Sequence, residues 1–500
     1  MAYVAYVTTL KNVRKHPNAD RLLLGDCFGN TVCVNLDYAE GEIGIYFPTD
    51  GQLSVEFAEQ NNLLRKKDEN GNNIGGYMDP DKRNVTAVKL RGEKSDGLFL
   101  PLSCVAYTGV NLDDLNVGDT ITTVNGHEIC TKYIPRTQKR AGHPSAGNRT
   151  RKKKVPTAPL FVEHADTEQL AYNLGAFRSG DEVEVTLKMH GTSQRTGYLP
   201  VFQGYKDSWH CRLKNWVKIA VEKMRHRMPI DIYKATLDHD GEPIYDWGYV
   251  TGTRRVVLDT YDGGFYGSNE FREQHHKMFE GKLHKGETVY YEVVGFTTDG
   301  ASIMSTVPNK RTADKEFIKQ YGETTVFSYG CEPSGYVTMY GEDEHGTFSL
   351  PVAKPQSDVY VYRMTMTNED GDVVEYTPDF MRYRCEQMGV KTVPVFAKVF
   401  VREDAVVSHN IDGTCSGGNL PEGVNIGEAV KMIAEQFYDG PDPIGKTHVR
   451  EGVVCRIVNR PKFAAFKHKN FSFKCLEGIA KADAEAPDME EAQGLEEDNG

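Results

Sequence analysis

Short β-type runs crowd the first 130 residues, and this pattern constrains the fold more than any other feature of the sequence. Gly, Asn and Asp separate the runs, which read VAYVTTL, TVCVNL, IGIYFP, VTAVKL, DGLFLP and TITTV. Short strands at such spacing are typical of a small β-barrel. From about Leu160 to Gly478, strand-like and helix-like patterns are mixed instead. We therefore predict an α+β protein, with a barrel at 1–130 ahead of a larger mixed domain at 159–476.

The sequence near the start makes the barrel prediction more specific. His16-Pro-Asn-Ala-Asp-Arg-Leu, followed by a Gly/Asn turn and another strand, resembles the opening of tRNA-binding OB-fold modules. An OB-fold is a small barrel that binds oligonucleotides. The same pattern also fits a strand–turn–strand unit that contacts no RNA. Residues 1–130 are thus expected to form an OB-like module, and its contact with RNA stays open.

Length and composition limit the class of protein. A chain of 500 residues exceeds the size at which one hydrophobic core stops growing, which favours two or three domains. No run is apolar enough to span a membrane, and the first residues lack the features of a signal peptide. The ten cysteines form no CxxC pair or Cys/His cluster, which is typical of reduced thiols and argues against a structural zinc. We expect a cytoplasmic protein, of a bacterium or of the host cell if the source is viral.

Charge is distributed unevenly along the chain. The net charge is −12, but residues 477–500 hold nine acids against one lysine, Lys481, and so contribute −8. This tail has almost no large apolar residues and is predicted to be disordered. Solubility is its simplest role. The alternative is electrostatic repulsion of nucleic acid, which would speed product release.

A basic segment lies between the two expected domains. Residues 132–156 contain no acid and many Lys and Arg among Gly, Pro and Ser, so 131–158 is predicted to be a linker. Its cations Lys152, Lys153 and Lys154 are weak candidates for contacts with RNA phosphates. A localisation signal, or a linker without a special role, explains the same composition.

One basic amphipathic helix is evident in the middle of the chain. Pro229 marks its end, and its apolar residues recur at helical spacing: Leu213, Trp216, Ala220, Val221, Met224 and Met228. The other face carries cations: Arg212, Lys214, Lys218, Lys223 and Arg225. We predict that the apolar stripe packs on a core while the basic face is solvated. A nucleic-acid footprint is the alternative.

The segment from Glu184 to Ser193 is the centre of the functional prediction. An alternating strand delivers Lys188 and is followed by Met-His190-Gly191-Thr-Ser193. A lysine becomes a nucleophile when desolvation or neighbouring cations favour its neutral amine. Gly191 allows the backbone to approach a nucleotide closely. Taken alone, a surface lysine beside a turn is a common feature and predicts little.

Five further motifs strengthen the prediction because they follow in order, each near the end of a strand-like run. They read Trp247-Gly-Tyr-Val-Thr-Gly-Thr-Arg254-Arg255, Thr288-Val-Tyr-Tyr-Glu292-Val-Val-Gly, Asp358-Val-Tyr360-Val-Tyr362-Arg363-Met, Glu451-Gly452-Val-Val-Cys-Arg456 and Phe463-Ala-Ala-Phe-Lys467-His-Lys469-Asn470. With the lysine they supply what adenylyl transfer from ATP requires: cations for phosphoryl oxygens, carboxylates for a ribose hydroxyl or a divalent metal, and an aromatic ring for the base. Residues two apart on a strand share a face, so Lys467 and Lys469 are expected to reach one phosphate.

The ordered set resembles the motifs of the covalent nucleotidyltransferases, which comprise ATP-dependent DNA and RNA ligases and mRNA capping enzymes. The resemblance covers about 182–473 and is closest to RNA ligases that seal nicks in duplex RNA, because Lys-x-His-Gly is more typical of them than the Lys-x-Asp-Gly of DNA ligases. It implies an ATP-grasp-like ligase domain of antiparallel sheets flanked by helices. It also implies that Lys188 accepts AMP and that His190 supports the later, nucleic-acid-dependent steps.

The resemblance assigns roles to the remaining motif residues as well. It implies that Arg254 contacts the nucleotide or an RNA phosphate. Arg255 is the alternative candidate for this contact. Glu292 would bind the ribose, and Tyr362 would stack on the base. Three further residues complete the implied set. Glu451 would be a metal-binding or catalytic carboxylate, and Lys467 and Lys469 would bind the α-phosphate. ATP and Mg²⁺ or Mn²⁺ are the implied cofactors.

Several positions depart from the family pattern. Ser193 replaces the usual Asn or Arg, Arg363 follows Tyr362 where an Asp is common, and Arg456 replaces a Lys. A long insertion at 297–357, with strand-like TTVFSYG and GYVTMYG, separates two motifs and is expected to form a subdomain or lid. A Gly-rich stretch at 406–448 separates two others.

The order of the predicted domains distinguishes members of the superfamily. DNA ligases and capping enzymes usually carry an OB domain after the last motif, whereas here the OB-like module comes first and only the acidic tail follows. This arrangement resembles a bacterial RNA ligase group and implies an enzyme that joins a 3′-hydroxyl to a 5′-phosphate in nicked duplex RNA or an RNA–DNA hybrid. The sequence gives no oligomeric state, and a monomer is the default expectation. The alternatives are a DNA ligase, a capping guanylyltransferase, and a non-catalytic RNA-binding protein.

Overall fold

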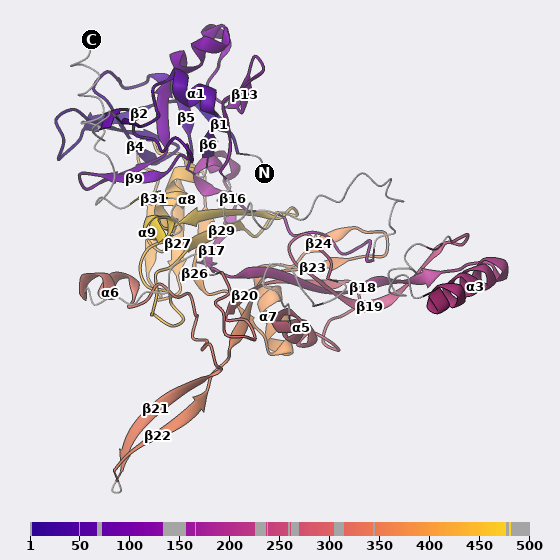
Figure 1. Cartoon of the computed structure of the whole chain (residues 1–500). Helices are drawn as coiled ribbons and strands as arrows, with labels where there is room; N and C mark the ends of the chain where they lie inside the picture. Colours follow the sequence, from indigo (N-terminus) through magenta and orange to yellow (C-terminus); the bar gives the residue numbers. More distant parts are fainter. Residues whose placement is uncertain are drawn as a thin grey trace.

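The computed structural model describes residues 3–49, 51–67, 73–133, 157–165, 167–225, 237, 239–258, 261, 270–304, 315–343, 346–476 and 480–481. The fold is mixed α/β and consists mostly of sheets, in agreement with the predicted α+β class. Figure 1 shows an N-terminal part, two large sheets beneath it, and two slender projections. Among the described residues, none of the helices combines the length and the apolar character that a membrane crossing needs.

Residues 3–133 form several small sheets around a buried core. The largest has the strand order β11-β5-β1-β12, and β2, β3 and β4 form another. Val7, Ile45, Phe47 and Phe57 are fully buried between these elements. In the described part, strand pairing does not join the sheets into a closed barrel, so the OB-like barrel remains a prediction.

The strands of this part have short, regular bounds: β1 Ala5–Thr9, β2 Lys11–Lys15, β3 Leu23–Cys27, β4 Asn30–Val34, β5 Ile43–Phe47, β6 Gly51–Leu53, β7 Lys66–Lys67, β8 Asn73–Gly75, β9 Ala87–Leu90, β10 Glu93–Asp96, β11 Leu98–Pro101, β12 Thr120–Ile121, β13 Thr123–Val124, β14 His127–Glu128 and β15 Cys130–Lys132. The helical elements are α1 Val55–Gln60, η1 Leu102–Thr108 and η2 Leu112–Asp114. Helix α1 begins where the Ser54 hydroxyl accepts a hydrogen bond from the Phe57 amide, which satisfies one free donor of the first turn.

Two large sheets make up the rest of the fold. The first has the order β16-β30-β29-β17-β26-β27-β28, with bounds β16 Glu168–Gln169, β30 Ala464–Lys469, β29 Gly452–Ile457, β17 Glu182–Lys188, β26 Val395–Val401, β27 Ala405–Asn410 and β28 Cys415–Asn419. The second has the order β19-β18-β20-β23-β24, with β25 pairing with β23, and its bounds are β19 Pro243–Gly252, β18 Thr192–Tyr205, β20 Glu287–Gly295, β23 Ser357–Thr367, β24 Val373–Glu375 and β25 Lys391–Thr392. Nearly all neighbouring strands are antiparallel, as predicted.

Helices cover both sheets and seal their cores. Helix α8 packs on the first sheet and presents Val430, Ile433 and Ala434 to its core. Helices α5 and α7 pack on the second sheet through Phe271, Met381 and Cys385. The helical elements of this part are α3 Trp209–Arg225, α5 Glu270–Lys277, α6 Lys315–Tyr321, α7 Pro378–Met388, α8 Ile426–Glu435, α9 Phe471–Leu476, η3 Leu170–Tyr172 and η4 Leu174–Ala176.

The N-terminal part packs directly on the first sheet. Lys474 forms an ion pair with Asp96 at 2.6 Å, and the Lys431 ammonium donates a hydrogen bond to the Gly29 carbonyl at 3.0 Å. A short strand near the C-terminus, β31 (Ala480–Lys481), pairs in parallel with β9. This strand lies in the segment 477–500 that was predicted to be disordered, so the structure departs from the prediction at these two residues.

Two projections extend from the sheets (Figure 1). One is the ribbon of β18 and β19 with helix α3 at its end. The other is the hairpin of β21 (Tyr336–Asp343) and β22 (Gly346–Ala353), which lies in the insertion at 297–357. The predicted strand GYVTMYG therefore forms as part of β21. The predicted strand TTVFSYG does not, because Phe327 and Tyr329 instead insert into the core of the first sheet.

The prediction that the apolar stripe of α3 packs on a core is wrong for its described residues. Leu213, Trp216 and Met224 are 50%, 67% and 74% exposed. The helix stands at the end of a long ribbon, so neither sheet offers a core for it to cover. The residues of α3 that are buried are polar, namely Asn215 and Glu222.

Candidate active site

Lys188 lies where the chain passes from the first sheet to the second. It is the last residue of β17, and Met189–Gly191 lead directly into β18. Gly191 is required here by packing, because a Cβ at this position would lie 2.4 Å from the Val293 carbonyl oxygen. The glycine thus brings the turn against β20. The sequence had suggested close approach to a nucleotide, whereas the structure shows close approach to a neighbouring strand.

Strand alternation explains which side chains reach the site. On β17, Val183, Val185 and Leu187 belong to the buried core, although Leu187 also borders the cleft that Glu184, Thr186 and Lys188 line. The adjacent strands repeat the pattern on the same side. They contribute Val454 and Arg456 from β29 and Ala465 from β30, with Phe463 just before β30.

Two clefts meet at Lys188. The Tyr362 cleft, of about 840 Å³, is lined among others by Lys188, Arg254, Glu292 and Tyr362. The His190 cleft, of about 760 Å³, is lined by Lys188, Arg254 and Glu292 again, and by His190, Glu451 and Lys469. Most of the residues assigned to the site from the sequence therefore surround one continuous space. Arg255 and Lys467 do not line either cleft, and Lys152, Lys153 and Lys154 lie outside the described residues.

Glu451 is the charged centre of the His190 cleft. Its Oε1 lies 2.6 Å from Lys188 Nζ and 3.4 Å from Lys469 Nζ, and its Oε2 lies 3.5 Å from His190 Nδ1. Burial disfavours the carboxylate, but the charges of Lys188 and Lys469 outweigh that effect and hold the pKa of Glu451 well below its usual range. The carboxylate is therefore ionised and holds the lysine amine in the cleft.

The pKa of Glu292 is shifted in the opposite direction to that of Glu451. Glu292 stands on β20 opposite Ser193 of β18. Burial raises the pKa of Glu292 to about 7, and the nearby charge of Glu451 adds to this effect, while Lys188 and Arg254 act against it. Two carboxylates around one lysine thus have widely separated pKa values, which is typical of a functional site rather than of structural ion pairs.

Lys467 and Lys469 lie on one face of β30, as the alternation of the strand predicted. Burial and the charges of Lys188 and Lys469 lower the pKa of Lys467 to about 8. Lys132, in β15 of the N-terminal part, adds to this cationic field. A polyanion entering the site would relieve the repulsion among these lysines.

Aromatic residues enclose His190. Its ring makes edge contacts with Phe327 and Phe473, with centroid distances of 4.9 and 4.8 Å, and its backbone amide donates a hydrogen bond to the Tyr329 hydroxyl at 2.7 Å. Sequence reasoning missed this cage because Phe327 and Tyr329 come from the insertion, far away in the chain. Their only sequence signal is the strand-like run TTVFSYG, which does not indicate a contact with His190.

The Tyr362 cleft ends in a cluster of rings and arginines. The Tyr362 hydroxyl shares a hydrogen bond with Ser193 Oγ at 2.9 Å, which keeps Ser193 at the site despite its departure from the family pattern. His164, which sequence reasoning also missed, lines the cleft, with its ring 5.1 Å from that of Tyr362. This residue lies in the stretch 157–165 that follows the basic segment, so the chain crosses the cleft on its way into the domain.

Arg363 and Arg456 have mainly a structural role. Both pair with the half-buried carboxylate of Glu375, Arg363 through a bidentate contact and Arg456 at 3.5 Å. Arg456 also donates a hydrogen bond to the Tyr376 carbonyl at 3.1 Å. The arginine that replaces the common acid after Tyr362 thus contacts a carboxylate of β24 instead.

The residues of the His190 cleft fit a divalent cation. Mg²⁺ and Mn²⁺ prefer oxygen ligands, and Glu451 and Glu292 present carboxylates to the same space. Glu451 Oε2 is buried and forms no well-aligned hydrogen bond within the described part of the chain. A cation would satisfy this oxygen.

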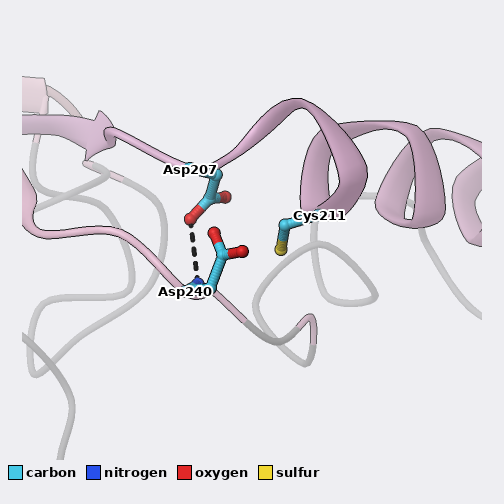
Figure 2. Close-up of side chains that lie close together, drawn as sticks. All are labelled: Asp207, Cys211 and Asp240. Atoms are coloured by element: carbon cyan, nitrogen blue, oxygen red, sulfur yellow. Dashed lines mark hydrogen bonds between the residues drawn. The ribbon is translucent and has the colours of Figure 1, made fainter.

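A second acidic cluster lies at the start of α3, remote from Lys188. Asp207, Cys211 and Asp240 approach one another there (Figure 2). The carboxylates already accept backbone hydrogen bonds, Asp207 from Asp240 at 3.1 Å and Asp240 from Ser208 at 2.9 Å. These contacts close the loop in front of the helix, and we assign no metal to them.

Comparison with solved structures finds a similar fold in the RNA ligase of Naegleria gruberi. The ligase with PPi aligns with a TM-score of 0.50 and 16% sequence identity, over 94% of this chain and 97% of that one. A mutant of that ligase with ATP and Mn also gives 0.50 and 16%, over 94% and 98%. No protein-family model and no curated protein matches the sequence. At this identity the likeness shows the fold alone, so this chain has the fold of an RNA ligase.

Proposed function

We propose that the protein is an ATP-dependent RNA ligase that forms a covalent lysyl–AMP at Lys188. The observation that carries the proposal is the constellation around that lysine. Its amine lies 2.6 Å from Glu451, beside Lys469 and Glu292, at the meeting point of two clefts. Few functions other than nucleotidyl transfer require a partly buried lysine, further cations and two carboxylates with opposite pKa shifts together. The likeness to solved RNA ligases agrees with this reading.

In the first step, the neutral amine of Lys188 attacks the α-phosphorus of ATP, a P–N bond forms, and pyrophosphate leaves with the bonding electron pair. The ammonium must first lose one proton to solvent, since it has no lone pair, and the amine loses a second proton to solvent as the P–N bond forms. Lys467 and Lys469 stabilise the negative charge that builds on the phosphoryl oxygens. Glu451 holds the lysine in place until the nucleotide arrives.

The Tyr362 cleft is proposed to bind the nucleoside. Tyr362 offers a ring for the base, and Glu292 offers a carboxylate for the ribose hydroxyls. Arg254 lines both clefts and is suited to a phosphate at their junction. A divalent metal, Mg²⁺ or Mn²⁺, would supply further neutralisation of phosphate charge when held by Glu451.

The later steps follow from the same family resemblance. AMP passes from Lys188 to a 5′-phosphate, and a 3′-hydroxyl then attacks that end and expels AMP, with His190 in a supporting role. We propose that the substrate is a nick in duplex RNA or in an RNA–DNA hybrid. The protein is further proposed to act as a cytoplasmic monomer, with an OB-like module at 1–130, a linker at 131–158 and a catalytic domain at 159–476.

The test is covalent labelling with α-labelled ATP or GTP and Mn²⁺, read after denaturation. Lys188→Arg is the matched control, because it keeps a cation beside Glu451 but removes the nucleophile. We expect label from ATP that the variant abolishes, followed by sealing of a nick whose 3′-hydroxyl belongs to a ribonucleotide. Label from GTP alone would indicate a capping enzyme. The absence of label from a folded protein would refute the proposal in favour of RNA binding without catalysis.

A further inference from the structure

Helix α3 is carried by the two strands that frame the active site. β18 begins at Thr192, and β19 leads into Arg254, so the near end of the ribbon lines the His190 cleft through both of its strands. β18 has 14 residues and therefore spans roughly 45 Å. The helix stands at the far end of this ribbon (Figure 1). A ligand bound to α3 would therefore be connected to the His190 cleft through these two strands.

The outward side of α3 is an exposed aromatic and aliphatic stripe. Trp209 is 60% exposed, Trp216 is 67% exposed, and Leu213, Val217 and Met224 are 50%, 47% and 74% exposed. At 3.6 residues per turn these positions fall on one side of the helix, with the two tryptophans two turns apart. Exposed tryptophans cost free energy in water, so such a stripe marks a binding surface rather than a solvated face.

Cations flank the stripe on both sides. By helical periodicity Arg212 and Lys223 lie along one edge and Lys214 lies beyond the other, whereas Lys218 lies toward the side of Glu222. Arg212, Lys214 and Lys223 are exposed. The one acid of the helix, Glu222, is buried on the opposite side. The outward surface of α3 is thus aromatic at its centre and positively charged at its edges.

We infer that α3 binds an unpaired segment of the RNA substrate at a distance from the joining site, an inference that rests on the proposed RNA ligase function. Aromatic rings within a basic surface match single-stranded nucleic acid, whose bases stack on tryptophan while its phosphates pair with Lys and Arg. A base-paired region does not suit the stripe, because its bases are already stacked on one another. The ribbon therefore holds unpaired RNA roughly 45 Å from Lys188.

The β21–β22 hairpin differs from α3 in charge, and this difference supports RNA as the partner of α3. The β21–β22 hairpin also exposes aromatic residues, with Tyr336 58% and Tyr340 75% exposed, but near its tip it exposes the acid Glu342. It thus exposes aromatic side chains beside an acid, without the cations of α3. An anionic polymer is attracted to α3 and repelled by the tip of the hairpin.

The test compares binding and sealing in the full chain. A short fluorescein-labelled single-stranded RNA is titrated with wild type, Trp209→Ala/Trp216→Ala, and the matched control Tyr336→Ala/Tyr340→Ala. We expect about a tenfold loss of affinity per tryptophan and no loss in the control. Trp209 and Trp216 are two of the three tryptophans in the chain, so RNA should also quench the intrinsic fluorescence. Nicks flanked by an unpaired strand should be sealed more slowly by the tryptophan variant, and fully paired nicks at the wild-type rate.

Labelling with ATP separates this inference from the proposed function. The tryptophan variant should label Lys188 as wild type does, because the stripe lies far from the clefts. Normal labelling with unchanged RNA affinity would overturn the role of α3 alone. The inference also fails if the variant loses binding only to vesicles of anionic lipid, or if it converts a dimer of the wild-type protein into a monomer. In either case the stripe covers a different partner.

Discussion

The pocket around Lys188 and the helix α3 place charged and aromatic residues in opposite environments. In the pocket, Lys188 and Lys469 share the buried carboxylate of Glu451, and rings enclose His190. On α3, tryptophans and cations face solvent. Buried charges interact strongly and shift one another's pKa values, whereas exposed ones are screened by salt within about 10 Å. The pocket is therefore suited to chemistry, and α3 to reversible binding of a polyanion.

The largest expected difference is in the rate of labelling by ATP when one lysine of each region is replaced by Ala. Lys469→Ala removes a cation from the proposed phosphate site and should reduce labelling by ATP about 10²–10³-fold. Lys214→Ala, on α3, should leave labelling unchanged. The measurement is the initial rate of lysyl–AMP formation at saturating ATP. If both variants label equally fast, the division between a catalytic and a binding region is wrong.

A leucine in each region extends the comparison to stability. Leu187 is 2% exposed in the core beneath Lys188, whereas Leu213 is 50% exposed on α3. Leu187→Ala should destabilise the fold by about 2–5 kcal/mol, because it removes buried area and leaves a cavity. Leu213→Ala should change stability by less than about 0.5 kcal/mol. Urea unfolding followed by far-UV circular dichroism gives both values, and a large loss at Leu213 would mean that α3 packs on a core after all.

The smallest expected effect depends on pH. The pKa of Glu292 is about 7 in the folded protein and lower in the unfolded chain, so the folded state binds more protons between these values. Stability is therefore retained at pH 5 and decreases as the pH rises to about 7. Glu292→Gln should raise the unfolding free energy by about 1–3 kcal/mol at pH 8 and much less at pH 5.

The matched control for that pH experiment is Glu242→Gln, at an exposed position near the end of the ribbon. It should leave the urea midpoint unchanged at both pH values. A stabilisation by Glu292→Gln that is independent of pH would contradict the assigned cause. Loss of ATP labelling in the more stable Gln variant would show that this carboxylate is kept for function at a cost in stability.

Much of the candidate site follows from local sequence patterns. Alternation on β17 predicts that Glu184, Thr186 and Lys188 face the clefts, whereas on β30 Lys469 lines a cleft and Lys467, on the same face, does not. Six ordered motifs predicted that Lys188, Glu292, Tyr362 and Glu451 act together. The aromatic cage was not predictable in this way. Phe327 and Tyr329 reach His190 from more than 130 residues away, and a strand-like run carries no signal of what it will contact.

By itself the sequence determined which side chains share a face, because the periods of a strand and of a helix depend only on backbone geometry. This is why Lys467 and Lys469 lie together on β30, and why Trp209 and Trp216 lie together on α3. Only the tertiary structure decided what each face meets. The face of β30 meets a cleft full of charges, whereas the stripe of α3 meets solvent, since burial depends on where an element stands relative to the rest of the chain.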